Sequence, residues 1–76
     1  MNYCLIDFPV LAQGKVANLA GEQSICQKFY EMGIRKGAHI QNLGRLPFSQ
    51  NVHVIVGNES LVLREEEARL LEVCSF

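Results

Sequence analysis

Two histidines and three cysteines supply the imidazole and thiol groups of this 76-residue chain, which could bind a metal or act as nucleophiles. His39 and His53 each alternate with the apolar residues of an expected strand, so we expect both imidazoles to face solvent. The two strands should be hairpin neighbours, and some registers would place the rings side by side. Glu31 or Glu59 could add a carboxylate, but a protein metal site usually has three or four ligands. The histidine pair is a candidate metal site that does not by itself predict a bound cofactor.

The three cysteines, Cys4, Cys26 and Cys74, are an odd number without a C-x-x-C spacing. A secreted disulfide scaffold normally has an even and denser set. We therefore expect reduced thiols in a cytoplasmic protein. Cys4 and Cys74 lie near opposite termini, which often lie close together, so the two could meet in space. The alternative is that each thiol packs as a small apolar side chain.

Catalytic motifs are not readable in this sequence. It has no Cys-His or Ser-His-Asp constellation and no phosphate-binding loop of the form G-x-x-x-x-G-K-[ST]. The sequence therefore predicts a protein that is not an enzyme.

The charged residues are unevenly distributed, although the net charge is only −1. Residues 28–45 contain four basic residues and one acidic residue, whereas residues 65–72 contain four acidic residues and one basic residue. The small net charge argues against a general nucleic-acid binder. The two segments are either solvated faces or, for the first, a basic surface for an acidic partner.

Four side chains are candidates for contact with a protein partner. In "YEMGIRKGAHIQ", Gly33 and Gly37 are expected to form a structural turn between a helix and a strand, which pushes Arg35 and Lys36 into solvent. Further along, Arg45 and Phe48 belong to a hairpin loop. An exposed aromatic residue at a loop tip is typical of a binding hot spot, and the alternative is that Phe48 folds back over the barrel mouth.

The elements that must position these residues follow from the apolar periodicity. Ile25, Phe29 and Met32 share one face of a helix that begins at the N-cap residue Ser24. The alternating valines of residues 52–56 predict the clearest strand. The remaining predicted elements are strands at 15–19, 38–43, 60–64 and 71–74, a helix at 65–70, and a short edge segment at 5–11.

This order predicts a mainly β fold with two short helices. Short strands, tight turns and one small core indicate a small, SH3-like, partly open β-barrel, formed by residues 1–76 as a single domain. The longest apolar runs are far shorter than the ~18 residues needed to cross a bilayer, and the N-terminus has no signal-peptide pattern. We therefore expect a cytoplasmic protein.

The order of these segments resembles the FeoA family. The matching segments are "KFYEMGIRKGAHIQNL", the hairpin with Pro47, "VHVIVG" and "LVLREEEARLLEV", so that the resemblance covers about residues 8–74. Two features depart from the family pattern. The hairpin lacks the glycine and second proline of Pro-x-Gly-x-Pro, and Lys28 stands in for the usual basic residue of the helix.

The resemblance implies an SH3-like fold and an accessory role beside FeoB, a membrane permease for ferrous iron with a cytosolic GTP-binding domain. It would make the chain a binding module that regulates or assembles the permease, with Arg35, Lys36, Arg45 and Phe48 as the contact residues. Two other readings remain open. One is a free-standing metal-sensing domain that binds a transition metal ion, and the other is a small nucleic-acid-binding barrel.

Overall fold

The computed structural model describes residues 2–76. Six strands, two α-helices and one 3-10 helix make up the fold. In chain order they are β1 (Asn2–Cys4), the 3-10 helix (Leu5–Asp7), β2 (Gln13–Leu19), α1 (Gln23–Glu31), β3 (His39–Arg45), β4 (Val52–Val56), β5 (Glu59–Leu63), α2 (Glu65–Ala68) and β6 (Leu71–Ser75). Within these residues, no helix is long and apolar enough to cross a membrane.

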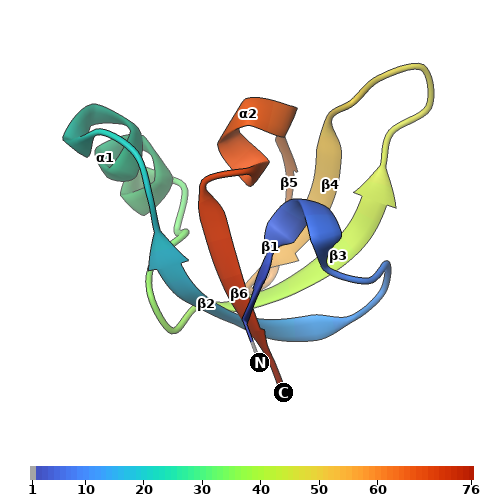
Figure 1. Cartoon of the computed structure of the whole chain (residues 1–76), viewed down its shortest axis with the longest axis horizontal. Helices are drawn as coiled ribbons and strands as arrows, with labels where there is room; N and C mark the ends of the chain where they lie inside the picture. The colour runs from blue at the N-terminus through green and yellow to red at the C-terminus, as the bar shows by residue number, and fades with distance from the viewer. Residues whose placement is uncertain (1) are drawn as a thin grey trace.

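The strands form one antiparallel sheet in the order β1-β6-β2-β3-β4-β5. The sheet curls so that β2 and β3 form its floor and both helices lie above it (Figure 1). β1 and β5 are the two ends of the sheet, which leaves the barrel partly open. The predicted mainly β, SH3-like architecture is therefore confirmed.

The core lies inside this curled sheet, where one face of each strand meets the helices. Val54 at the centre of β4 is fully buried, as are Phe29 of α1 and Ala68 of α2. The three valines of residues 52–56 thus face inward, as the two-residue period predicted. The other buried apolar residues are Leu5, Phe8, Val16, Ile34, Ile40, Val52, Val56, Leu63, Leu71 and Val73.

Several predicted boundaries differ from the structure. β2 begins at Gln13 rather than at residue 15, β5 lies one residue earlier than predicted, and β6 ends one residue later. β3 ends at Arg45 rather than at residue 43, so Arg45 belongs to the strand and not to the hairpin loop. α1 begins at Gln23 and its N-cap is Glu22, so Ser24 lies inside the first turn. α2 ends at Ala68, two residues before the predicted end. The segment 5–11, expected to lie at a sheet edge, contains the 3-10 helix and a loop, while the first strand lies before it at Asn2–Cys4. The three residues of β1 do not alternate between polar and apolar, so the sequence alone does not predict a strand there. β1 forms because it pairs with β6.

A buried asparagine fixes the N-terminal loop to the floor of the barrel. Asn42 on β3 is 4% exposed, and its side chain donates to the Phe8 carbonyl at 2.6 Å and accepts from the Gly44 amide at 2.9 Å. Its backbone also accepts from the Leu11 amide. The register of β3 shifts between Asn42 and Gly44, so this side chain satisfies polar groups that a β-bulge would leave unpaired.

Candidate functional site

The turn after α1 is a complete helix-terminating motif. The Ile34 amide donates to the Phe29 carbonyl at 2.8 Å, and the Gly33 amide donates to the Tyr30 carbonyl at 3.0 Å. This is the hydrogen-bond pattern of a Schellman motif, and the buried contact between Ile34 and Phe29 accompanies it. Gly33 has a φ of 87°, in the left-handed region that glycine adopts without strain.

The same turn presents two basic side chains beside a groove. Arg35 and Lys36 are exposed and line a hollow of about 290 Å³ between α1 and the end of β2. The Arg35 guanidinium lies 4.2 Å from the centroid of the Tyr30 ring, a cation–π contact that holds it in place. Within residues 2–76, neither Arg35 nor Lys36 forms an ion pair. We call this hollow the basic groove, which is lined by Leu19, Gln23, Cys26, Gln27, Tyr30, Arg35 and Lys36.

The structure places the other two predicted contact residues at the far end of β3. Arg45 is the last residue of that strand, and its Nη1 lies 3.0 Å from Glu65 Oε2 and 3.0 Å from the Gln50 carbonyl oxygen. Phe48, at the tip of the following loop, is fully exposed. The alternative that Phe48 folds back over the barrel is therefore wrong. The four predicted residues divide into two groups at opposite ends of β3.

Ion pairs connect α2 to its surroundings and lower the pKa values of two of its carboxyls. The pKa of Glu65 lies below its ordinary value of 4.5 because the carboxylate accepts hydrogen bonds from Arg69, at 2.9 Å, and from Arg45. Burial would raise the pKa of Glu67, but Lys28 Nζ at 2.6 Å and the Arg64 amide outweigh it and lower the pKa. Lys28 and Arg45 are thus neutralised, unlike Arg35 and Lys36.

The two histidines are separated by the register of β3 and β4. His53 pairs with Gly44, whereas His39 lies at the other end of β3, where its carbonyl accepts from the Gly57 amide. The His39 ring stacks on Phe76 with centroids 5.2 Å apart, and His53 hydrogen-bonds Ser60. The side-by-side arrangement does not occur. Among the described residues, no group of three or more His, Cys, Asp or Glu side chains could hold a metal ion.

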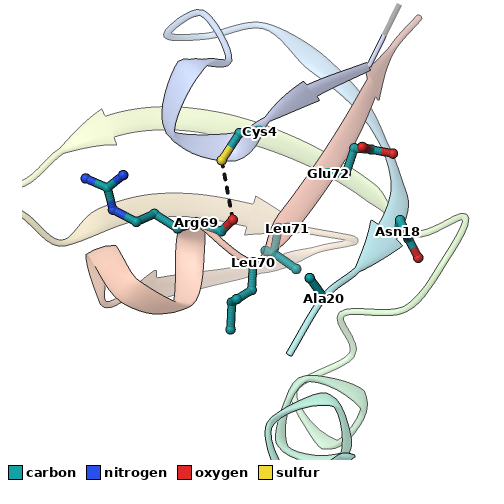
Figure 2. Close-up of a pocket in the computed structure, with 7 residues that line it drawn as sticks. All are labelled: Cys4, Asn18, Ala20, Arg69, Leu70, Leu71 and Glu72. Carbon is teal, nitrogen blue, oxygen red and sulfur yellow. Dashed lines mark hydrogen bonds between the residues drawn. The ribbon is translucent and has the colours of Figure 1, made fainter. Parts of the chain in front are cut away.

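A second hollow of about 170 Å³ lies around Cys4, between the end of β2 and the start of β6 (Figure 2). The Cys4 thiol donates to the Arg69 carbonyl at 3.5 Å, and the Arg69 guanidinium points away from the hollow toward Glu65. Glu72 accepts from Asn2 at 3.0 Å. Cys4 pairs with Glu72 rather than with Cys74, and all three thiols are free.

A third hollow of about 320 Å³ lies under the N-terminal loop, and no pattern in the sequence predicts it. Five apolar residues line it, Leu5, Ile6, Phe8, Val10 and Val52, together with Asn42, Gly44 and Arg45 of β3. We call it the apolar cavity. It arises because residues 5–10, which have no regular period, fold over the β3–β4 hairpin, and only the three-dimensional arrangement brings these side chains together.

Comparisons with known proteins agree with the fold. The model of the FeoA domain matches residues 4–74. A crystal structure of an iron uptake regulatory protein (FeoA) has a TM-score of 0.88 at 26% identity, with 100% of both chains covered. A FeoA-like protein from Clostridium acetobutylicum has a TM-score of 0.85 at 25% identity, over 99% of this chain and 87% of that one. No curated protein sequence matches the chain significantly.

The same fold occurs within larger regulators. A manganese-dependent transcriptional repressor matches 99% of this chain with a TM-score of 0.89, but only 42% of the repressor is covered. At 20% identity this likeness shows the fold alone.

Proposed function

Because the chain belongs to the FeoA domain family, we propose that it is a cytoplasmic accessory protein of ferrous iron transport, which binds the cytosolic part of the FeoB permease and regulates or assembles it. Membership of the family implies the role in ferrous iron transport. The partner and the contact surface are proposed from the chemistry of the basic groove.

The observation that carries the proposal is the pair of uncompensated cations at the basic groove. Arg35 and Lys36 have no acidic partner within residues 2–76, while Lys28, Arg45 and Arg69 each have one. Lys15 and Arg64 also form no ion pair among these residues, but neither lines the groove. Two free positive charges beside an apolar floor and an aromatic ring favour an acidic segment of a protein partner. Because Tyr30 already holds Arg35, little side-chain entropy is lost when the partner binds.

The surface is centred on Arg35 and Lys36 rather than spread over all four predicted contact residues. Arg45 is engaged with Glu65, so an acidic partner would have to compete with an existing ion pair. Phe48 lies beyond the other end of β3, away from the basic groove. The proposed contact is therefore local and electrostatic, and its basic residues mainly speed encounter and fix orientation.

The role that we propose is binding without catalysis. Cys26 lines the basic groove, but its thiol lies within 3.9 Å of the Ala20 and Gly21 carbonyls and donates to them.

Ferrous iron uptake in cells that lack their own copy of this protein tests the proposal. We expect the double variant Arg35→Glu plus Lys36→Glu to reduce uptake toward the level of cells without the protein, while the wild-type chain restores it. The matched single variants are Lys36→Glu and Lys15→Glu, which make the same change in charge inside and outside the groove. Lys15 is exposed on β2 and does not line the groove. Wild-type uptake with a stable double variant at equal abundance would overturn the proposal.

A further inference from the structure

Two loops of the barrel hold large apolar side chains in solvent on a strained backbone. Leu11 and Phe48 are the residues other than glycine, among residues 2–76, that have a positive φ, at 72° and 60°. Bulky side chains rarely adopt this left-handed region, and their side chains are 64% and 108% exposed, so neither belongs to the core. Asparagine or glycine would suit both positions better for folding alone. The presence of leucine and phenylalanine thus points to a contact outside the folded chain.

The two loops lie on the same side of the molecule. The Leu11 amide donates to the Asn42 carbonyl at 2.6 Å, which fixes this residue beside β3. Val10, which is 62% exposed, lies against Gly44 of the same strand, and Phe48 follows the end of that strand. The loop before β2 and the loop between β3 and β4 both lie at the right-hand side of Figure 1. We call Val10, Leu11 and Phe48 the apolar tips.

The segments that carry the apolar tips contain no charged side chain. Residues 8–14 and 46–52 consist of apolar residues, serine, asparagine, glutamine, glycine and proline. Asp7 and Arg45, which precede the two segments, carry opposite charges, and Arg45 is already paired with Glu65. Removing a charged group from water is costly unless the group is paired. The apolar tips can therefore enter an apolar medium without that cost.

Hydrogen bonds within each loop satisfy backbone groups close to the tips. The Ala12 amide donates to the Pro9 carbonyl at 3.1 Å, and the Leu46 amide donates to the Asn51 carbonyl at 3.0 Å. The Asn51 amide also donates to Ser49 Oγ at 2.8 Å. These bonds lower the number of amides that would lose water without a partner in an apolar medium. They also fix the loops in advance, so that little conformational freedom is lost on contact.

We propose that the apolar tips enter the interfacial region of a lipid bilayer, so that the chain binds a membrane surface without crossing it. A protein partner would need a separate pocket for each protruding side chain, whereas a lipid surface accepts convex tips at any spacing. Apolar groups at the boundary of headgroups and acyl chains bind in proportion to the area that they bury. The inference goes beyond the proposed function, because α1 and the basic groove lie on the opposite side of the molecule (Figure 1).

Cosedimentation with phosphatidylcholine vesicles tests the inference. The wild-type chain should partition onto these uncharged vesicles to an extent that does not change with salt, because no ionic attraction takes part. Phe48→Asn and Leu11→Asn should each lower the partition coefficient at least about fivefold through the lost apolar area. Both should unfold at temperatures no lower than the wild type, since asparagine adopts a positive φ more readily. The matched control Phe76→Asn, at a side chain that is 76% exposed and outside both loops, should partition as the wild type does.

A single tryptophan shows which part of the molecule meets the lipid. The chain contains no tryptophan, so Phe48→Trp and Phe76→Trp each introduce one fluorescent reporter. With vesicles, the emission of the Phe48→Trp variant should shift to the blue and be quenched by lipids that are brominated in their acyl chains. The emission of the Phe76→Trp variant should not change.

Three outcomes would overturn the inference. The first is a wild-type chain that does not sediment with the vesicles. The second is binding that salt abolishes or that both asparagine variants retain, which assigns the contact to other residues. The third is a blue shift of the Phe48→Trp variant with the permease's cytosolic part and none with vesicles, which assigns the apolar tips to a protein partner.

Discussion

Gly33 is the residue on which the geometry of the basic groove depends. Its positive φ lets the backbone leave α1, so that Ile34 enters the core and Arg35 points outward. A Cβ at this position would meet no atom within 4 Å. The requirement for glycine is thus one of backbone conformation and not of space.

Gly33→Val should destabilise the fold by more than about 1 kcal/mol, because a β-branched residue is strained at positive φ. Gly33→Asn should destabilise it less, since asparagine adopts the left-handed region more readily. Urea denaturation of the three proteins measures the difference. Equal midpoints for the valine variant and the wild type would mean that this turn does not need its left-handed residue.

Asn42 holds the N-terminal loop through two buried side-chain hydrogen bonds. Asn42→Ala should cost about 2 to 5 kcal/mol, because the Phe8 carbonyl and the Gly44 amide would each lose a buried partner. Thermal unfolding followed by circular dichroism checks this. Asn18→Ala, at an exposed position on β2, serves as the control and should change stability by less than about 0.5 kcal/mol. Similar effects of the two substitutions would contradict the role given to Asn42.

These two residues also show what can be predicted from the sequence. The turn at Gly33 could be predicted, because this glycine directly follows a helical pattern of apolar residues that ends at Met32. That signal lies in neighbouring residues of the sequence. Asn42 could not, because it lies in a strand like any polar residue that faces solvent. Its burial depends on a bulge and on a loop more than thirty residues earlier in the chain.

Among the elements, α2 is short and depends on its ion pairs. Four residues are too few for a helix to be stable on its own in water. Glu65 forms ion pairs with Arg69 and with Arg45 of β3, and Glu67 forms an ion pair with Lys28 of α1. These charged contacts connect α2 to β3 and to α1.

The stability of the fold should therefore fall as the pH drops below about 4.5. Hydrogen bonds from Arg69 and Arg45 lower the folded-state pKa of Glu65 below its ordinary value of 4.5. A lowered carboxyl pKa contributes stability above the unfolded-state pKa and loses it as the pH falls through the folded-state pKa. Glu65→Gln should weaken this dependence, and urea denaturation between pH 6 and pH 3 measures it. Glu66→Gln, which forms no ion pair in residues 2–76, should keep the wild-type slope. A wild-type slope in Glu65→Gln would contradict the account.

The elements that the sequence predicted well are those whose own residues show a period. The alternation of residues 52–56 and the helical spacing of Ile25, Phe29 and Met32 each reflect a buried face. β1 and the 3-10 helix were missed because their form comes from pairing with β6 and packing on the core. The apolar cavity was missed for the same reason.

At the scale of the whole molecule, β3 separates two surfaces of different chemistry. The basic groove lies at its start and the exposed Phe48 beyond its end. The prediction from the sequence joined these residues into one partner surface. The ion pair between Arg45 and Glu65 and the position of Phe48 favour two separate contacts, one electrostatic and one apolar.

The central claim is that the basic groove binds the cytosolic part of the FeoB permease. Calorimetric titration of that purified part with the wild-type chain, with Arg35→Glu plus Lys36→Glu and with the control Lys15→Glu tests it most directly. We expect saturable binding by the wild type and the control that weakens as salt rises, because the contact is between opposite charges at the surface. The double variant should bind at least about tenfold more weakly, consistent with the loss of two charged contacts. No binding by the wild type, or equal binding by the folded double variant, would contradict the claim.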